Sequence, residues 1–171
     1  MQDMETLVQE HGRAIYGLCR KLATTREDAD DLYQQTFLIA LGKTFRADGN
    51  PRALLAKICV AQWKNEQRKL ARRSRIAPPA ELDAELLTGG DDPAKEYSQR
   101  QLYAAVRKIV ANLDDRCRLP VYLYYAADLP LKEIVRVLGC PEGTVKSRLS
   151  AARAAIKKEL EVNGYDGQTI G

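Results

Sequence analysis

Hydrophobic residues recur at helical spacing along most of the chain, and no segment is assigned as a strand. In the first half they follow one another at steps of three and four residues in three runs, 7–22, 29–41 and 54–62. This spacing places side chains on one face of an α-helix. We therefore predict three helices packed as one bundle, with the core side of the third formed by Leu54, Leu55, Ile58, Ala61 and Gln62.

Two short signals mark where these helices begin. Thr25 and Asp28 have the spacing of a capping box, in which the side chain at the helix entrance bonds a backbone N–H further on. Pro51 is well placed as a first helical residue, because its missing N–H costs least there. The second helix should therefore begin after Thr25, and the third should run from Pro51 to about Arg73.

The segment 74–93 has a different composition from the rest of the first half. It contains Pro78-Pro79, Gly89-Gly90 and scattered acidic residues, and it has little periodic apolar content. Such a segment cannot bury enough apolar surface to form a core element. We predict an all-α fold of two small helical bundles joined by this flexible acidic linker.

The second half returns to helical spacing. A helix beginning near Ala94 should place on one face the residues Leu102, Val106, Ile109, Val110 and Leu113. Asp114-Asp115 is expected to cap the next helix, which carries Leu119, Val121, Leu123 and Tyr124. Pro120 falls near its first turn, where a missing N–H costs least; a placement one turn deeper would produce a kink. The glycine-containing end, 163–171, is predicted to be a flexible tail.

The segment Leu129–Leu160 has the pattern of a DNA-binding helix-turn-helix. Its first helix has an apolar face ending at Leu138, and Gly139-Cys140-Pro141 breaks it before a second helix. The apolar stripe of the second helix should face the domain, and it consists of Val145, Leu149, Ala152 and Ile156. The opposite side offers small residues with lysines beside them, which suits close approach to base edges with cations on the phosphates. The alternative is an ordinary helical hairpin with a solvated basic face.

Charge adds a second candidate surface. The chain has 171 residues, 45% hydrophobic composition and a formal net charge of +4, which together indicate a globular protein. Basic residues cluster between Lys64 and Arg75, and acidic residues follow between Glu81 and Asp92. Because phosphate contacts supply much of nucleic-acid affinity, the basic block is a possible second footprint; a solvated helix end is the alternative.

Other chemistry has little support. The four cysteines lie far apart, and His11 is the single histidine, so we expect no metal site and no cofactor. The cysteines fit buried thiols in a reducing compartment. With neither a signal peptide nor a long apolar span, the protein is expected to be cytoplasmic and without membrane insertion of its own. A nucleophile elbow and a phosphate loop are both absent from the sequence, so no enzymatic activity is expected.

Two motifs resemble one known family. The string Gly143-Thr144-Val145-Lys146-Ser147-Arg148-Leu149, followed by Ala152-Arg153, is similar to the promoter-reading helix of extracytoplasmic-function (group IV) RNA polymerase sigma factors. The segment Ala29–Leu41 is similar to their polymerase-docking helix, and Phe45-Arg46 precedes the helix that engages the minus-10 element. The resemblance covers nearly the whole chain. It implies a region 2 domain at 1–73, a linker at 74–93, a region 4 domain at 94–162 and a tail at 163–171.

The resemblance also implies three binding surfaces. Core RNA polymerase would be bound by Asp31, Gln34, Gln35, Phe37 and Leu38. Helical spacing turns some of these residues inward, so Asp31, Gln34 and Gln35 are the favoured contact face, and the aromatic Phe37 and Tyr33 are left mostly to packing. The displaced strand of the minus-10 element would be held by Arg46, Asp48, Asn50, Lys57, Ala61, Lys64, Asn65, Arg68 and Lys69. The minus-35 duplex would be read by Arg136, Thr144, Lys146, Ser147, Arg148, Ser150, Ala151, Arg153 and Lys157.

Three positions depart from the family pattern. Leu54-Leu55 stands where the family often has Trp-Leu, and Ala61 stands where an asparagine often lines the base pocket, so no minus-10 preference is transferred. Pro130 replaces the usual serine or threonine before the helix-turn-helix and can serve as a first helical residue. Trp63 could stack on a base, but core packing is the favoured role.

The implied partners are bacterial core RNA polymerase, promoter DNA as minus-35 duplex and minus-10 single strand, and an anti-sigma factor. The free chain is expected to be a monomer. The main alternative is a conventional dimeric helix-turn-helix transcriptional regulator, in which residues 1–73 would serve dimerisation or sensing. A purely protein-binding helical adaptor and a nucleic-acid-modifying enzyme rank below it.

Overall fold

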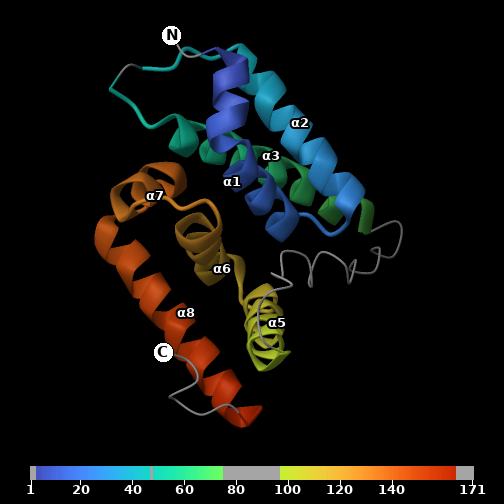
Figure 1. The fold of residues 1–171 in the computed structure, drawn as a ribbon, viewed down its shortest axis with the longest axis vertical. Helices are drawn as coiled ribbons and strands as arrows, with labels where there is room; N and C mark the ends of the chain where they lie inside the picture. Colours follow the sequence, from blue (N-terminus) through green and yellow to red (C-terminus); the bar gives the residue numbers. More distant parts are fainter. Residues whose placement is uncertain (1–2, 47, 75–96, 165–171) are drawn as a thin grey trace.

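The computed structural model describes residues 3–46, 48–74 and 97–164, and within them every regular element is a helix. The elements are α1 (Met4–Leu22), α2 (Arg26–Leu41), α3 (Pro51–Ser74), α5 (Tyr97–Ala111), α6 (Asp115–Val121), the π-helix η1 (Tyr122–Ala126), α7 (Leu131–Leu138) and α8 (Glu142–Val162) (Figure 1). The predicted all-α fold is confirmed. The predicted linker beyond Ser74 and the tail beyond Gly164 lie outside the described residues.

The first three helices begin where side chains can satisfy their free N–H groups. Asp3 accepts from the Thr6 N–H at 2.7 Å, and Thr25 Oγ1 accepts from the Asp28 N–H at 3.0 Å. Loss of such a cap typically costs about 0.5–2 kcal/mol. The predicted starts of α2 after Thr25 and of α3 at Pro51 are both confirmed.

The third helix is central to the fold. Its buried side chains point in several directions, and they are Ala53, Leu55, Ala56, Ile58, Cys59, Val60 and Trp63. The expected core face is only partly right, because Leu55 and Ile58 are buried, Leu54 and Gln62 are partly exposed, and Ala61 is exposed. The reason is that α3 packs against α1 and α2 on one side and against α7 on another, so the Ala61 side is left to solvent.

Trp63 packs in the core, as predicted. Its side chain is 4% exposed, and its indole N–H donates to the Leu22 carbonyl, with Nε1 and the oxygen 2.9 Å apart. The Arg118 guanidinium of the second half lies 5.8 Å from the indole ring centroid. A single aromatic residue therefore joins α3 to the end of α1 and to α6.

The cysteines follow the prediction in part. Cys19 and Cys59 are buried with their sulfurs 3.6 Å apart, whereas Cys117 and Cys140 are only partly buried. The hydrogen bond with Cys59 and burial raise the pKa of the Cys19 thiol above its usual value. Within the described residues no group of three or more potential metal ligands comes together, and no helix is long and apolar enough to span a membrane.

The second half contains one departure from the expected helix. Pro120 lies one turn deeper than the first turn of α6, which is the alternative placement, and it leaves the Arg116 carbonyl without the usual backbone donor. The π-helix η1 follows at once, and its end is marked by the Ala127 N–H donating to the Tyr122 carbonyl at 3.0 Å. Tyr122 and Leu123 are buried, whereas Tyr124 and Tyr125 point out of the core.

The helix-turn-helix forms as predicted, with one change at its entrance. Pro130 precedes α7 as its N-cap and is not its first residue. Gly139 ends α7 with φ at +66°, a left-handed conformation that a side chain would disfavour. Val145, Leu149 and Ala152 of α8 are buried and Ile156 is partly buried, so the predicted stripe faces the domain.

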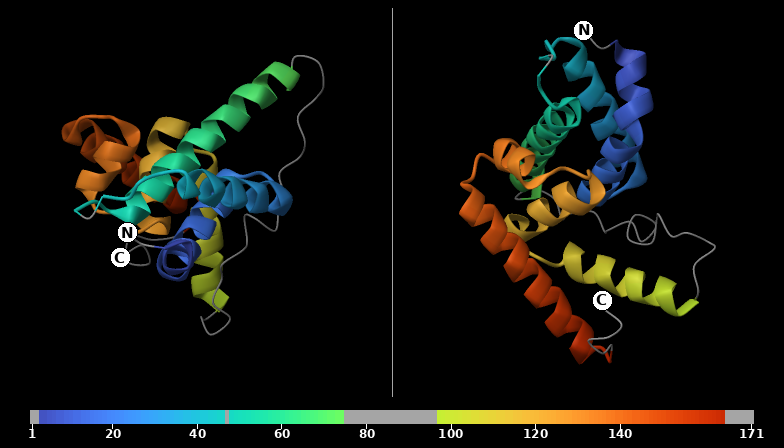
Figure 2. Two further views of the ribbon diagram at one scale, coloured as in Figure 1. Left: turned by 90° about the horizontal axis from the view of Figure 1, so that it is seen from above. Right: turned by 60° about the vertical axis from the view of Figure 1, so that its left-hand side comes forward.

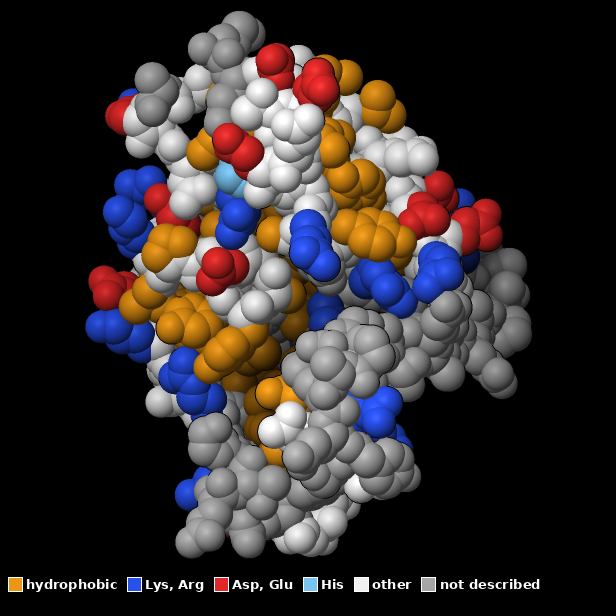
Figure 3. Space-filling model, viewed as in Figure 1, with side chains coloured by type: hydrophobic (Ala, Val, Ile, Leu, Met, Phe, Trp, Pro, Cys, Tyr) orange, Lys and Arg blue, Asp and Glu red, His pale blue; other side chains and the backbone are white. Residues whose placement is uncertain are grey.

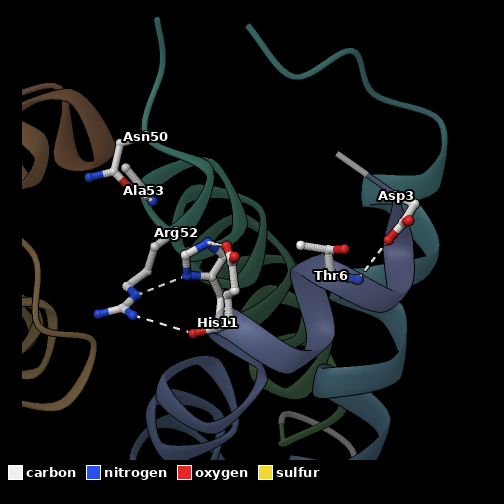
Figure 4. A network of polar contacts seen from close by, with 7 residues as sticks. Asp3, Thr6, His11, Asn50, Arg52 and Ala53 are labelled. Carbon is white, nitrogen blue, oxygen red and sulfur yellow. Dashed lines mark hydrogen bonds and ion pairs between the residues drawn. The ribbon is translucent and has the colours of Figure 1, made fainter. Parts of the chain in front are cut away.

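The two halves contact each other directly. Figure 2 shows α7 beside the N-terminal part of α3, while α8 extends away from the first three helices. Arg52 at the start of α3 lies 3.6 Å from Asp128 in the loop before α7. The same guanidinium donates through Nε to His11 Nδ1 at 3.3 Å (Figure 4). The domain boundaries inferred from the sequence stay a prediction.

His11 gives this contact region a dependence on pH. Its side chain is 13% exposed, and burial together with the positive charge of Arg52 lowers the pKa of the imidazole, with Glu10 opposing the shift. The unfolded chain therefore binds a proton more readily than the folded chain. As pH falls through about 6.5, the unfolded state gains protons first, and the free energy of unfolding decreases.

We expect urea denaturation to show that the free energy of unfolding decreases between about pH 7.5 and pH 5.5. His11→Asn keeps an acceptor near Arg52 but does not titrate, so its unfolding free energy should fall less over this range than that of the unmodified chain. Equal pH dependence in the two proteins would contradict the assigned role of His11.

Candidate functional site

Four of the five residues assigned to polymerase binding form an exposed stripe on α2. Asp31, Gln34, Gln35 and Leu38 are exposed, and their spacing puts them on one face of the helix. Phe37 does not belong to this stripe. It is 8% exposed, and its ring centroid lies 4.9 Å from that of Tyr33, so its side chain belongs to the core.

The α2 stripe ends in an apolar surface formed by Leu38, which was assigned to polymerase binding, and Leu41, which was not. Leu38 is 59% exposed and Leu41, one turn further on, is 61% exposed. Neighbouring exposed leucines are a feature of protein-binding surfaces. Leu41 was missed as a candidate, although its position one turn beyond Leu38 and two turns beyond Gln34 was a usable signal.

A shallow groove of about 470 Å³ borders this stripe between α1 and α2. It is lined by Gly12, Arg13, Tyr16, Asp30, Tyr33 and Gln34. The Tyr16 hydroxyl donates to Asp30 Oδ1 at 2.7 Å, and this hydrogen bond raises the pKa of Tyr16. The groove therefore places a fixed carboxylate and hydroxyl next to Gln34.

The basic residues assigned to the minus-10 strand share one side of α3. Lys57, Ala61, Lys64, Asn65 and Arg68 are all exposed and recur at helical spacing. The C-terminal part of α3 projects beyond the neighbouring described helices (Figure 2). Small and cationic residues along one open face can follow a nucleic-acid backbone.

Several of these cations already have partners. Arg68 donates to Asn65 Oδ1 at 3.2 Å, and Lys69 Nζ lies 3.4 Å from Glu66 Oε1. These are exposed pairs, which are weak and readily exchanged for a phosphate.

The loop before α3 holds the other candidates of this group. Arg46 and Asp48 are exposed and lie 3.4 Å apart as an ion pair. Asn50 is partly buried, and its Oδ1 accepts from the Ala53 N–H at 3.1 Å. The carbonyl side of Asn50 is therefore used to cap α3, a role that the sequence analysis did not assign to it.

The outer face of α8 is built from small exposed residues. Ser147, Ser150, Ala151 and Ala154 are exposed, opposite the buried stripe. Lys146 is exposed and lies 3.3 Å from Glu142, and Lys157 is exposed further along the helix. The small face with flanking cations matches the chemistry needed to enter a DNA groove.

Three assigned residues are less free than expected. Thr144 and Arg148 are partly buried, and the Arg148 Nη1 lies 3.3 Å from Cys140 Sγ, across the turn of the helix-turn-helix. Arg136 forms an ion pair at 3.2 Å with Glu133, whose side chain is 7% exposed. Arg148 therefore also stabilises the turn, and Arg136 compensates a buried carboxylate.

Arg153 has aromatic neighbours that the sequence analysis did not connect with it. Its Nε donates to the Tyr125 hydroxyl at 3.2 Å, and its guanidinium carbon lies 5.9 and 6.0 Å from the ring centroids of Tyr124 and Tyr125. The face in Figure 3 shows hydrophobic side chains gathered toward α6 and α8, with Lys and Arg around them. No local signal predicts this cluster, because the residues are 28 positions apart along the chain.

Comparison with known protein families gives two family models that match this chain, in the order expected from the sequence. Residues 7–73 match the family model "Sigma-70 region 2", and residues 103–156 match "Sigma-70, region 4". The chain is similar to the RNA polymerase sigma-H factor of Pseudomonas aeruginosa, with 28% identity over 92% of this chain and 86% of that protein. It is 30% identical to the ECF RNA polymerase sigma factor SigM of Mycobacterium tuberculosis, over 91% of this chain and 76% of that one.

Solved structures share the fold. The sigma factor RpoE in complex with the anti-sigma factor NepR from Bartonella quintana gives a TM-score of 0.77 at 21% identity, covering 95% of this chain and 99% of that one. CnrH in complex with the cytosolic domain of CnrY gives 0.67 at 23% identity, covering 94% and 89%. The helical arrangement described above is thus the arrangement of these proteins.

Proposed function

The chain belongs to the sigma-70 family, as an extracytoplasmic-function RNA polymerase sigma factor, and from this premise we propose how its three exposed helix faces divide the work of transcription initiation. A sigma factor binds core RNA polymerase and promoter DNA. The observation that carries the division is that each face is an exposed stripe on a different helix, α2, α3 or α8. A conventional dimeric regulator is not favoured, because it would leave the region 2 match without a role.

The α2 stripe is the polymerase-docking face in this proposal. Asp31, Gln34 and Gln35 supply polar contacts, and Leu38 with Leu41 supplies an apolar centre, the combination found in stable protein interfaces. Phe37 supports the stripe from inside, because its buried ring packs on Tyr33 one turn earlier in α2, and Tyr33 contacts Tyr16 of α1 edge to face. The groove beside Gln34 extends the same face toward α1.

The α3 side with Lys57, Lys64 and Arg68 is proposed to hold the displaced strand of the minus-10 element. A protein can recover roughly 1–3 kcal/mol per unstacked base by giving that base a new surface. Ala61 leaves a small site in the middle of this side. Arg46 and Asp48 in the preceding loop lie before the helix entrance and are assigned to the same strand.

The outer face of α8 is proposed to read the minus-35 duplex. Ser147, Ser150 and Ala151 allow close approach to base edges, while Lys146 and Lys157 are assigned to phosphates. With few large side chains on this face, part of the specificity should come from the shape of the DNA.

An anti-sigma factor is the remaining proposed partner. One of the similar solved structures is a sigma factor in complex with the anti-sigma factor NepR, which supports a comparable partner for this chain. Such a partner would cover polymerase-binding and DNA-binding faces together. We also propose that the protein acts in the cytoplasm, as a monomer when free, and by binding alone without catalysis.

Leu38→Asp should weaken binding to core RNA polymerase by about tenfold to a hundredfold, because it removes a buried apolar contact and introduces a charge into the interface. Fluorescence anisotropy of labelled chain with sigma-free core polymerase measures this. Val162→Asp, at a 74% exposed position on α8, is the matched control and should bind as the unmodified chain does. Equal affinity for the Leu38 variant would remove α2 from the docking face.

A further inference from the structure

The Arg153 side chain is held by neutral groups and not by a carboxylate. Its Nε bonds the Tyr125 hydroxyl, and both tyrosine rings lie against the guanidinium. Three other cations of the second half pair with acids: Arg118 with Asp115, Arg136 with Glu133 and Lys146 with Glu142. Among the described residues, Arg153 has no acidic partner, so its full charge is available to an anion.

The direction of the guanidinium is also constrained. Because Nε is bonded to Tyr125, the two terminal nitrogens are the donors left for a ligand. Two parallel N–H groups fit a phosphate better than a single flexible ammonium does. The Tyr125 hydroxyl accepts from Arg153 and therefore keeps its own proton as a further donor.

The two tyrosines belong to the π-helix η1, which directly continues α6. Tyr122 and Leu123 anchor η1 in the core, while Tyr124 and Tyr125 are 39% and 60% exposed and contact each other edge to face at 4.8 Å. π-Helical turns occur frequently at functional sites. Here the turn brings two aromatic rings to the edge of the outer face of α8.

Arg153 lies on that face. It is one turn from Ser150 and from Lys157, and two turns from Lys146, so these side chains follow one line along α8. We propose that Tyr125 is a positioning residue, which holds the Arg153 guanidinium against a phosphate of the duplex that α8 binds. This inference rests on the proposed assignment of α8 to the minus-35 duplex.

The test uses holoenzyme assembled from core polymerase and the full chain, and a duplex fragment carrying a start site mapped by run-off transcription with the unmodified chain. Arg153→Ala should lower affinity about tenfold and reduce the slope of log affinity against log salt by about one. Tyr125→Phe should lower affinity about threefold to tenfold, since it removes only the hydroxyl that orients the charged group.

A matched control and a double variant separate positioning from packing. Tyr124→Phe keeps its ring against Arg153, and the Tyr124 hydroxyl has no hydrogen bond in the described structure, so affinity should stay within about twofold. In the Arg153→Ala background, Tyr125→Phe should have no further effect. Circular dichroism melting confirms that each variant is folded.

Two results overturn the inference alone: Tyr125→Phe binding as tightly as the unmodified chain, or losing the same factor when Arg153 is already alanine. If holoenzymes carrying Arg153→Ala and Ala151→Glu both bind the fragment as tightly as the unmodified holoenzyme, the assignment of α8 to the duplex fails and the inference fails with it.

Discussion

Ala151→Glu should reduce promoter-dependent transcription by roughly a hundredfold or more, because it places a carboxylate in the middle of the small outer face of α8, where DNA phosphates and base edges would lie. Ala151 is exposed and flanked by Ser150 and the buried Ala152, so the longer side chain has room in the free protein. The helix should form normally, since glutamate is a good helix former. Multi-round transcription from a mapped promoter measures the effect.

Two further variants make this result specific. Gln101→Glu adds the same charge to an exposed position of α5 and should leave transcription nearly unchanged. Binding of the Ala151 variant to core polymerase should also be unchanged, because α2 is untouched. Normal transcription by the Ala151 variant would show that this face does not contact the promoter.

Trp63→Ala should lower the free energy of unfolding by about 3–5 kcal/mol, the usual cost of emptying a buried aromatic site. The side chain is 4% exposed and contacts elements from both halves of the molecule. Much of the stability of a domain this size, commonly about 5–15 kcal/mol, would be lost. Denaturation in urea, followed by circular dichroism, measures the change without relying on the indole fluorescence.

Trp63→Phe separates the contribution of apolar packing from that of the indole hydrogen bond. It keeps most of the apolar volume but leaves the Leu22 carbonyl without the indole donor, so the loss should be nearer 1–3 kcal/mol. The assigned role of Trp63 would be wrong if the Trp63→Ala and Trp63→Phe variants both had the same urea midpoint as the unmodified chain.

The fold was largely predictable because its signals are local. The start of α2 follows from Thr25 and Asp28, the start of α3 from Pro51, and the turn of the helix-turn-helix from Gly139. Each of these signals involves only residues within about one helical turn of one another. The buried stripe of α8 follows from the same short spacing.

The failures come from contacts between distant segments. Ala61 was assigned to the core because periodicity does not reveal that α3 is packed on two sides and open on a third. Pro120 was placed near the first turn of its helix, but it lies one turn deeper, and α6 continues directly into a π-helix. The sequence has no short-range signal for either arrangement.

The candidate surfaces were predictable to a similar degree. The α2, α3 and α8 faces follow from helical spacing together with the family resemblance, and the exposed side chains lie along single stripes. Phe37 was carried over with the docking segment of the family, and its burial confirms the packing role that helical spacing favoured. The link from Tyr125 to Arg153, and from Arg52 to Asp128, needs the tertiary structure.

Run-off transcription tests the central claim most directly: purified chain is added to sigma-free bacterial core polymerase on sheared DNA from its own host, and the transcripts are sequenced from their starts. A sigma factor of this family predicts discrete start sites with shared upstream minus-10 and minus-35 elements. The account would be contradicted if the chain gave no start sites beyond those of core polymerase alone and also did not bind the core enzyme.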